Sequence, residues 1–124
     1  MVFFIQKGRK AMGISEFLLT VGVPAHIVGY DFLLCAVEAS QQEPDLLHHI
    51  MKRLYPYVAE KCGTTPSRVE RGIRHAITII CDKNRLLMVN ALIGCDVFAA
   101  HDKPANGEFI ALLAKRFDQK GRLK

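Results

Sequence analysis

The sequence predicts an all-α protein, a compact bundle of six or seven helices. From Ile14 onward, apolar residues recur at helical spacing almost throughout. No stretch alternates apolar and polar residues long enough to form a strand. Proline and glycine divide the pattern at intervals typical of helices. We therefore expect one domain over residues 14–124, and a tail or linker over residues 1–13, where no period is evident.

The expected helices follow from the periodicity and from the residues at their ends. They cover residues 14–22, 30–42, 44–54, 56–63, 66–81, 84–94 and 107–117. Pro44, Pro56 and Pro66 suit the first helical turn, where a missing N–H is tolerated. Ser15 and Asn106 are expected N-caps. Residues 95–106 are expected to be a loop, with a short extended piece at 96–98.

Composition limits the function classes. The 124 residues include 17 Lys and Arg against 12 Asp and Glu, a formal net charge of +5, which favours a polyanionic partner. The four cysteines form no C-x-x-C pair, so we expect buried, reduced thiols, with no metal site and no cofactor. The longest apolar stretches are far short of the ~20 residues of a membrane span. The N-terminus does not resemble a signal peptide. These observations predict a cytoplasmic protein.

Two helices lie very close together in the middle of the chain. The first is expected to end at Gly63 and the second to begin at Pro66, with Thr65 as its N-cap. Only residues 63–65 connect them. Such a short turn with a leading glycine is typical of a helix-turn-helix, and Ala59 supplies the small side chain that steep packing needs.

The second of these helices is amphipathic. At 100° per residue, one side forms a stripe of the width expected for a core-facing surface: Val69, Ile73, Ala76, Ile77 and Ile80. The other side is mostly cationic: Ser67, Arg71, Arg74, His75 and Thr78, with Arg68 and Glu70 beside it. A solvated helix face is the alternative, since Glu70 and Arg74 form an i,i+4 pair that stabilises a helix without any partner.

Two residues make this helix a poor choice for stability alone. Arg68 stands in the first turn, where the helix dipole disfavours cations, and at the N3 position that a Glu would fill in a capping box. Gly72 costs about 0.5–1 kcal/mol relative to Ala in a helix interior. Residues that lower the stability of their own helix are expected at functional sites. Their presence here favours a DNA-contacting helix over a plain solvated surface.

The residue types suggest individual roles. Arg68 and Arg71 can each bond guanine bidentately, and Glu70 can accept from the N4 amine of cytosine. Ser67 can bond a base or a phosphate. Because Glu70 repels phosphates, it favours sequence-specific reading of a G/C-containing site. Contacts to the DNA backbone are expected from Thr64, Thr65, Arg74 and His75.

Three blocks carry a family resemblance: "GVPAHIVGY", "YPYVAEKCGTTPSRVERGIRHAI" and "KPANGEFIALLAKRF". Over roughly residues 14–117 the chain resembles the C-terminal effector domain of the stage-zero sporulation response regulator. The resemblance implies a six-helix domain that binds a short promoter box in double-stranded DNA, with Lys103 near the backbone. It also implies homodimers on tandem boxes, with a contact through the last helix. That contact would involve Phe109 and Leu113, unless these two side chains belong to the core.

The chain departs from that family in three places. The family carries a receiver domain, for which these residues leave no room, and we expect a natural N-terminus at Met1. Gly72 stands where the family pattern leads us to expect alanine. Residues 82–97 are more apolar than the family segment implicated in contact with RNA polymerase, which puts activation through that surface in question.

The sequence therefore predicts a sequence-specific, sporulation-type transcription regulator. The alternative is an interaction module without a receiver domain, which pairs with a full-length relative and modulates its DNA binding. An enzyme is not expected. His48 and His49 lie on a helix with no paired Cys or Asp to activate either of them.

Overall fold

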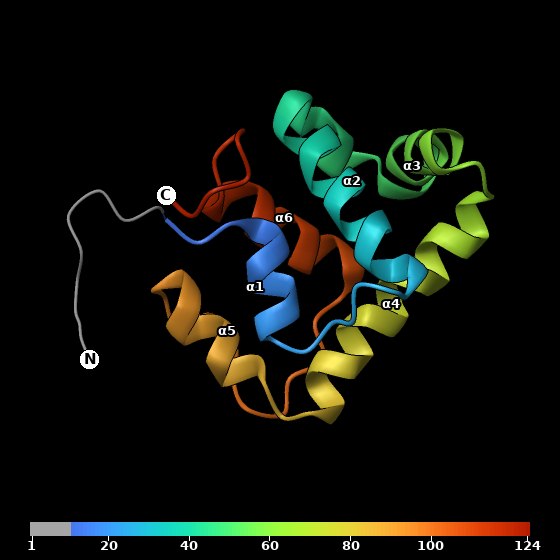
Figure 1. Ribbon diagram of the computed structural model, residues 1–124. Helices are drawn as coiled ribbons and strands as arrows, with labels where there is room; N and C mark the ends of the chain where they lie inside the picture. The colour runs from blue at the N-terminus through green and yellow to red at the C-terminus, as the bar shows by residue number, and fades with distance from the viewer. Residues whose placement is uncertain (1–10) are drawn as a thin grey trace.

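The computed structural model describes residues 11–124, so most of the expected tail over 1–13 lies outside the described residues. The all-α prediction is confirmed (Figure 1). Between residues 11 and 124, isolated bridges occur but no strand forms, and residues 96–98 belong to no helix or strand. The α-helices are α1 (Ile14–Thr20), α2 (Val28–Gln42), α3 (Tyr55–Cys62), α4 (Pro66–Asp82), α5 (Leu86–Ile93) and α6 (Asn106–Arg116).

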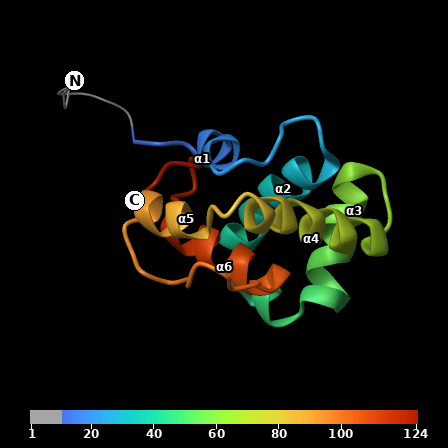
Figure 2. The ribbon, with the colours of Figure 1, turned by 90° about the horizontal axis from the view of Figure 1, so that it is seen from below.

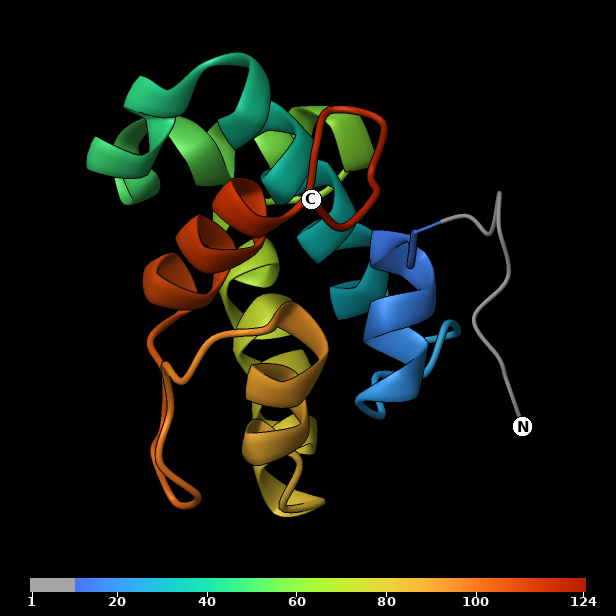
Figure 3. The ribbon, with the colours of Figure 1, turned by 90° about the vertical axis from the view of Figure 1, so that its left-hand side faces the viewer.

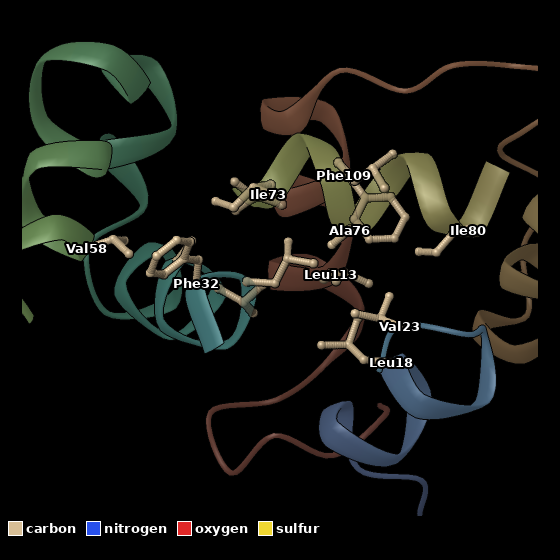
Figure 4. Close-up of a cluster of buried hydrophobic side chains, with 14 of the residues drawn as sticks. Leu18, Val23, Phe32, Val58, Ile73, Ala76, Ile80, Phe109 and Leu113 are labelled. Atoms are coloured by element: carbon tan, nitrogen blue, oxygen red, sulfur yellow. The ribbon is translucent and has the colours of Figure 1, made fainter. Parts of the chain in front are cut away.

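The core lies where α2, α4 and α6 meet. Helix α2 packs against both α4 and α6, and α3 packs against α4. Figure 4 shows Phe32 of α2, Ile73 of α4 and Leu113 of α6 around this centre, and all three are buried. Leu18 of α1 and Val23 cover another side of the same cluster. The expected inner stripe of α4 is fully engaged in this core.

Residues 44–54 are not the single helix that the pattern predicts. A 3₁₀ turn covers Pro44–His48 and a π turn covers Ile50–Leu54, with a break at His49. The N–H groups of both Arg53 and Leu54 donate to the His49 carbonyl, at 2.8 and 3.1 Å. The wider turn ends two residues before Pro56, which has no N–H for the carbonyl four residues back. Periodicity alone does not reveal such a change of pitch.

Two helix ends agree with prediction and two do not. Thr65 caps α4, its hydroxyl accepting the Arg68 N–H at 3.3 Å, and Gly63 ends α3 with φ of 67°. Ser15 does not cap α1, because Gly13 is the N-cap. Asn106 does not cap α6 either. Ala105 holds that position, and the Asn106 side chain turns into the core.

The C-terminal segment folds back onto the start of the described chain. The Ile14 N–H donates to the Gly121 carbonyl at 2.7 Å, and the Leu123 N–H donates to the Met12 carbonyl at 2.8 Å. The Gln41 side chain at the end of α2 donates to the Phe117 carbonyl at 2.8 Å. Figure 3 shows this segment returning past α1 and α2. Within residues 11–124, no helix has the length and apolar character needed to cross a membrane.

Candidate DNA-binding interface

The predicted helix-turn-helix consists of α3, the turn 63–65 and α4. Gly63 takes the left-handed conformation, and the Thr64 N–H donates back to the Ala59 carbonyl at 2.9 Å. This bond satisfies a carbonyl in the last turn of α3, and the left-handed Gly63 turns the chain sharply. Pro66 then begins α4 on the capping Thr65. Helix α4 lies along one side of the molecule, with α2, α3 and α6 on its inner side (Figures 1 and 2).

The N-terminal half of α4 presents two arginines to solvent. Ser67, Arg68 and Arg71 are all exposed. In the described part of the chain, neither the Arg68 nor the Arg71 guanidinium has a salt bridge or a side-chain hydrogen bond. Both guanidinium groups therefore keep all their N–H donors for an external acceptor.

Glu70 stands on one flank of this face and pairs with Arg74. The two side chains form a hydrogen-bonded ion pair, and the Glu70 side chain is 35% exposed. The i,i+4 pair that the sequence suggested is therefore present. On the wheel, Glu70 and Arg68 lie on opposite flanks, with Ser67 and Arg71 between them. The four predicted base-reading side chains thus span the width of the exposed face.

A groove of about 580 Å³ runs beside α4 on the Glu70 flank. Its walls are α4 and the segment 103–107, which brings Lys103 to the same side of α4 as Arg74. The Cys81 thiol of α4 lies 3.7 Å from the Asp102 carbonyl, next to this segment. The Lys103 side chain is exposed. The structure therefore brings Lys103 next to α4, although many residues separate them along the chain.

The remaining predicted backbone contacts lie at the two ends of the exposed face. Thr65 is exposed and Thr64 partly so, at the start of α4. The Thr65 hydroxyl oxygen accepts the capping bond, which leaves its hydrogen for a phosphate oxygen. His75 is exposed one turn beyond Arg71. All the predicted DNA-contacting side chains thus lie on α4, on its leading turn or on the neighbouring segment.

Asn106 is a structural residue of this interface that sequence reasoning assigned to another role. Its side-chain N–H group donates to the Tyr55 hydroxyl and to the Glu70 carbonyl, both at 3.0 Å. The amide thus joins α3, α4 and α6 behind the exposed face. No local sequence pattern identifies this role, because both partners are distant along the chain.

The structure gives Gly72 a packing role in place of the functional one inferred from sequence. Gly72 is buried against α2, and a Cβ added to it would lie 2.7 Å from the Phe32 ring. Its cost in helix propensity is therefore explained by close helix packing. Gly72 no longer supports DNA contact, whereas the argument from Arg68 is unaffected.

The expected dimer contact through Phe109 and Leu113 is wrong. Both side chains are 0% exposed, and both point into the core in Figure 4. Elsewhere, three apolar side chains are exposed on α5 and the following loop: Leu87, Met88 and Val97. The expectation of four buried thiols also fails, because Cys62 is exposed and Cys35, Cys81 and Cys95 are only partly buried.

A helix-turn-helix whose second helix exposes unpaired arginines at its N-terminal end is typical of a DNA-binding domain. Residues 14–117 match the family described as "Sporulation initiation factor Spo0A C terminal". The chain belongs to this family, and its domain is a sporulation-associated DNA-binding effector domain of a response regulator. The family is one of DNA-binding regulators rather than of enzymes, with double-stranded DNA as partner.

Proposed function

We propose that the chain is a sequence-specific transcription regulator that reads a short G/C-containing promoter box with α4 in the major groove. The observation that carries the proposal is the pair of exposed guanidinium groups of Arg68 and Arg71, which have no carboxylate partner in the described residues. Arginine presents its donors in a fixed fork that matches guanine O6 and N7. Two arginines that only faced solvent would be equally exposed. Sequence preference in DNA binding therefore distinguishes base-reading arginines from solvated ones.

In this proposal, Glu70 supplies the discrimination between cytosine and the other bases. Its carboxylate accepts from cytosine N4 on one flank while Arg68 and Arg71 bond guanine on the other side. Its ion pair with Arg74 holds the carboxylate in place before DNA arrives. Arg74, His75, Thr64, Thr65 and Lys103 hold the phosphates and set the register of α4.

Assembly on DNA is part of the proposal. We propose that two copies bind tandem boxes, through side chains of α6 other than the buried Phe109 and Leu113. The exposed apolar residues Leu87, Met88 and Val97 are the proposed surface for RNA polymerase. Their exposure supports a protein contact, because burying exposed apolar side chains against a partner is favourable.

The experiment selects duplexes from a random pool and compares the enriched box with a scrambled one at fixed salt. We expect an enriched box containing G/C pairs. Arg68→Ala or Arg71→Ala should lower the ratio of specific to scrambled affinity by about 5- to 150-fold, the equivalent of ~1–3 kcal/mol. Lys120→Ala, which removes an exposed cation from the C-terminal segment, is the charge-matched control. It should leave that ratio unchanged.

Two results would contradict the proposal. If Arg68→Ala and Arg71→Ala weakened binding to all duplexes equally, the arginines would be backbone contacts only. If no duplex were enriched while the chain altered DNA binding by a full-length relative, the interaction-module alternative would be correct.

A further inference from the structure

The groove between α4 and the segment 103–107 contains hydrogen-bonding groups that the proposed DNA contacts do not use. Its volume of about 580 Å³ is within the range of sites that bind small molecules. Tyr55 and Asn106 both line it, although the two residues are only 6% and 9% exposed. Two buried polar side chains thus belong to the wall of a cavity that is large enough for a ligand.

Both side-chain N–H donors of Asn106 are occupied within the protein. They donate to the Tyr55 hydroxyl oxygen and to the Glu70 carbonyl, each at 3.0 Å. The Glu70 carbonyl can only accept, so the amide nitrogen must face it, and this fixes the orientation of the amide. The Asn106 Oδ1 atom is left as an acceptor, and within residues 11–124 no donor reaches it.

The Tyr55 hydroxyl has the opposite group free. Its oxygen accepts from Asn106, and its hydrogen donates to no acceptor in the described part of the chain. The hydrogen bond that joins the two side chains keeps them next to each other. Tyr55 and Asn106 therefore offer one free donor beside one free acceptor. Because a buried polar group without a partner costs free energy, a ligand that satisfies both is favoured.

The other residues of the groove define the rest of the ligand. Its charged lining residues cancel in formal charge: Glu70, Asp82, Arg74 and Lys103. Its apolar lining residues include Met51, Ile77 and Pro104. A charged ligand gains no net attraction from such a wall, whereas an uncharged apolar body is favourably buried there. The free donor and acceptor match the adjacent C=O and N–H of a neutral amide or lactam.

We propose that this groove binds a small neutral molecule that carries an amide or lactam edge on an apolar body. The ligand N–H donates to Asn106 Oδ1, and the ligand carbonyl accepts from the Tyr55 hydroxyl. The apolar body packs against the apolar lining of the groove. Any effect of the ligand on DNA affinity rests on the proposed function, since Arg74 and Lys103 line the same groove, whereas binding of the ligand does not.

The test titrates the isotope-labelled protein with 2-quinolone, an uncharged bicyclic lactam, and follows the backbone amide signals by NMR without DNA. We expect saturable shifts in residues 103–107 and on the facing side of α4, with a dissociation constant on the order of 1 mM, typical of a molecule of this size. The matched control probe is N-methyl-2-quinolone, which has the same body but no N–H. It should bind at least about fivefold more weakly, the loss of one neutral hydrogen bond.

Two variants test the protein side of the same contact. Tyr55→Phe removes the free donor and should weaken binding of 2-quinolone by about fivefold. Tyr57→Phe is the matched control variant, because Tyr57 lies on the same helix but does not line the groove. It should bind 2-quinolone as the wild type does. The dispersion of the amide signals checks that each variant is folded.

Four results would overturn the proposal: shifts that do not saturate, shifts centred on another part of the surface, equal affinity for the two probes, or unchanged affinity in Tyr55→Phe. Because no DNA is present, failure of this test is distinct from failure of the proposed DNA reading.

Discussion

Gly29 and Gly72 face each other where α2 crosses α4. A Cβ added to Gly29 would lie 2.2 Å from the Gly72 carbonyl oxygen and 3.1 Å from the Ala76 Cβ. The two helices therefore approach closely only because neither residue has a side chain. This crossing supports the back of α4 and sets its position against the core.

Gly29→Ala should destabilise the protein strongly. The new methyl group would meet backbone, which cannot rotate away, so the helices must separate, at a cost of about 3 kcal/mol. Gly107→Ala is the matched control. There the new Cβ would meet the Cδ1 atom of Ile50 at 2.4 Å, the movable end of a half-buried side chain. Urea denaturation should show a loss for Gly29→Ala and a change within about 1 kcal/mol for Gly107→Ala. Equal losses would contradict the close-packing argument.

Glu70→Gln should alter sequence preference without unfolding the domain. The exposed ion pair with Arg74 contributes only about 0.3–0.5 kcal/mol, so stability should change little. The amide cannot accept as a carboxylate does, and discrimination for cytosine should fall by about 5- to 150-fold. Competition binding with single-base variants of the selected box measures this. Glu38→Gln on α2 changes the net charge equally and should leave the preference intact. If Glu70→Gln kept the wild-type sequence preference, Glu70 would not be a base-reading residue.

Asn106→Ala should destabilise more than Tyr55→Phe. The alanine variant loses both bonds of the amide, to the Tyr55 hydroxyl and to the Glu70 carbonyl, inside the core. We expect a loss of about 2 kcal/mol, against about 1 kcal/mol for Tyr55→Phe, which keeps the bond to α4. Chemical denaturation followed by circular dichroism measures both. A larger effect from Tyr55→Phe would show that the hydroxyl, not the amide, holds the three helices together.

Stability should fall as pH rises above about 9 because of Cys35. Burial, and then the nearby Cys62 thiol, raise the pKa of Cys35 from 9.0 to about 11, with Glu38 raising it further and Lys61 lowering it. The folded state therefore keeps the proton where the unfolded state loses it, so the stabilisation present below pH 9 is lost between pH 9 and 11. Urea midpoints under reducing conditions should show a steeper loss for wild type than for Cys35→Ala. Parallel curves would contradict this assignment.

The sequence predicts α4 well because its signals are local. Thr65 caps it, Pro66 begins it, and its buried stripe repeats at helical period, so the predicted range 66–81 differs from the observed Pro66–Asp82 by one residue. The exposed arginines follow from the same periodicity. The helical segments elsewhere also begin and end close to their predicted positions, since proline and glycine mark many of those ends.

The parts that sequence reasoning missed depend on distant partners. Asparagine is a common N-cap, but the Asn106 amide instead lies in the core, where it donates hydrogen bonds to the Tyr55 hydroxyl and the Glu70 carbonyl. Gly72 is unfavourable in its own helix and is explained only by Gly29 on another. Phe109 and Leu113 fit a dimer surface or a core equally well by spacing, and only the packing of α6 shows that both are core.

The pairing of the two ends of the described segment gives residues 12–123 the topology of a nearly closed ring. Met12 and Gly13 meet Arg122 and Leu123, so the path can be joined there and opened elsewhere. We expect a circular permutant that starts in the exposed loop at Ala100, with a short linker across the old ends, to keep the helices and their packing. The order in which the helices are synthesised can therefore be changed independently of the surface that α4 presents.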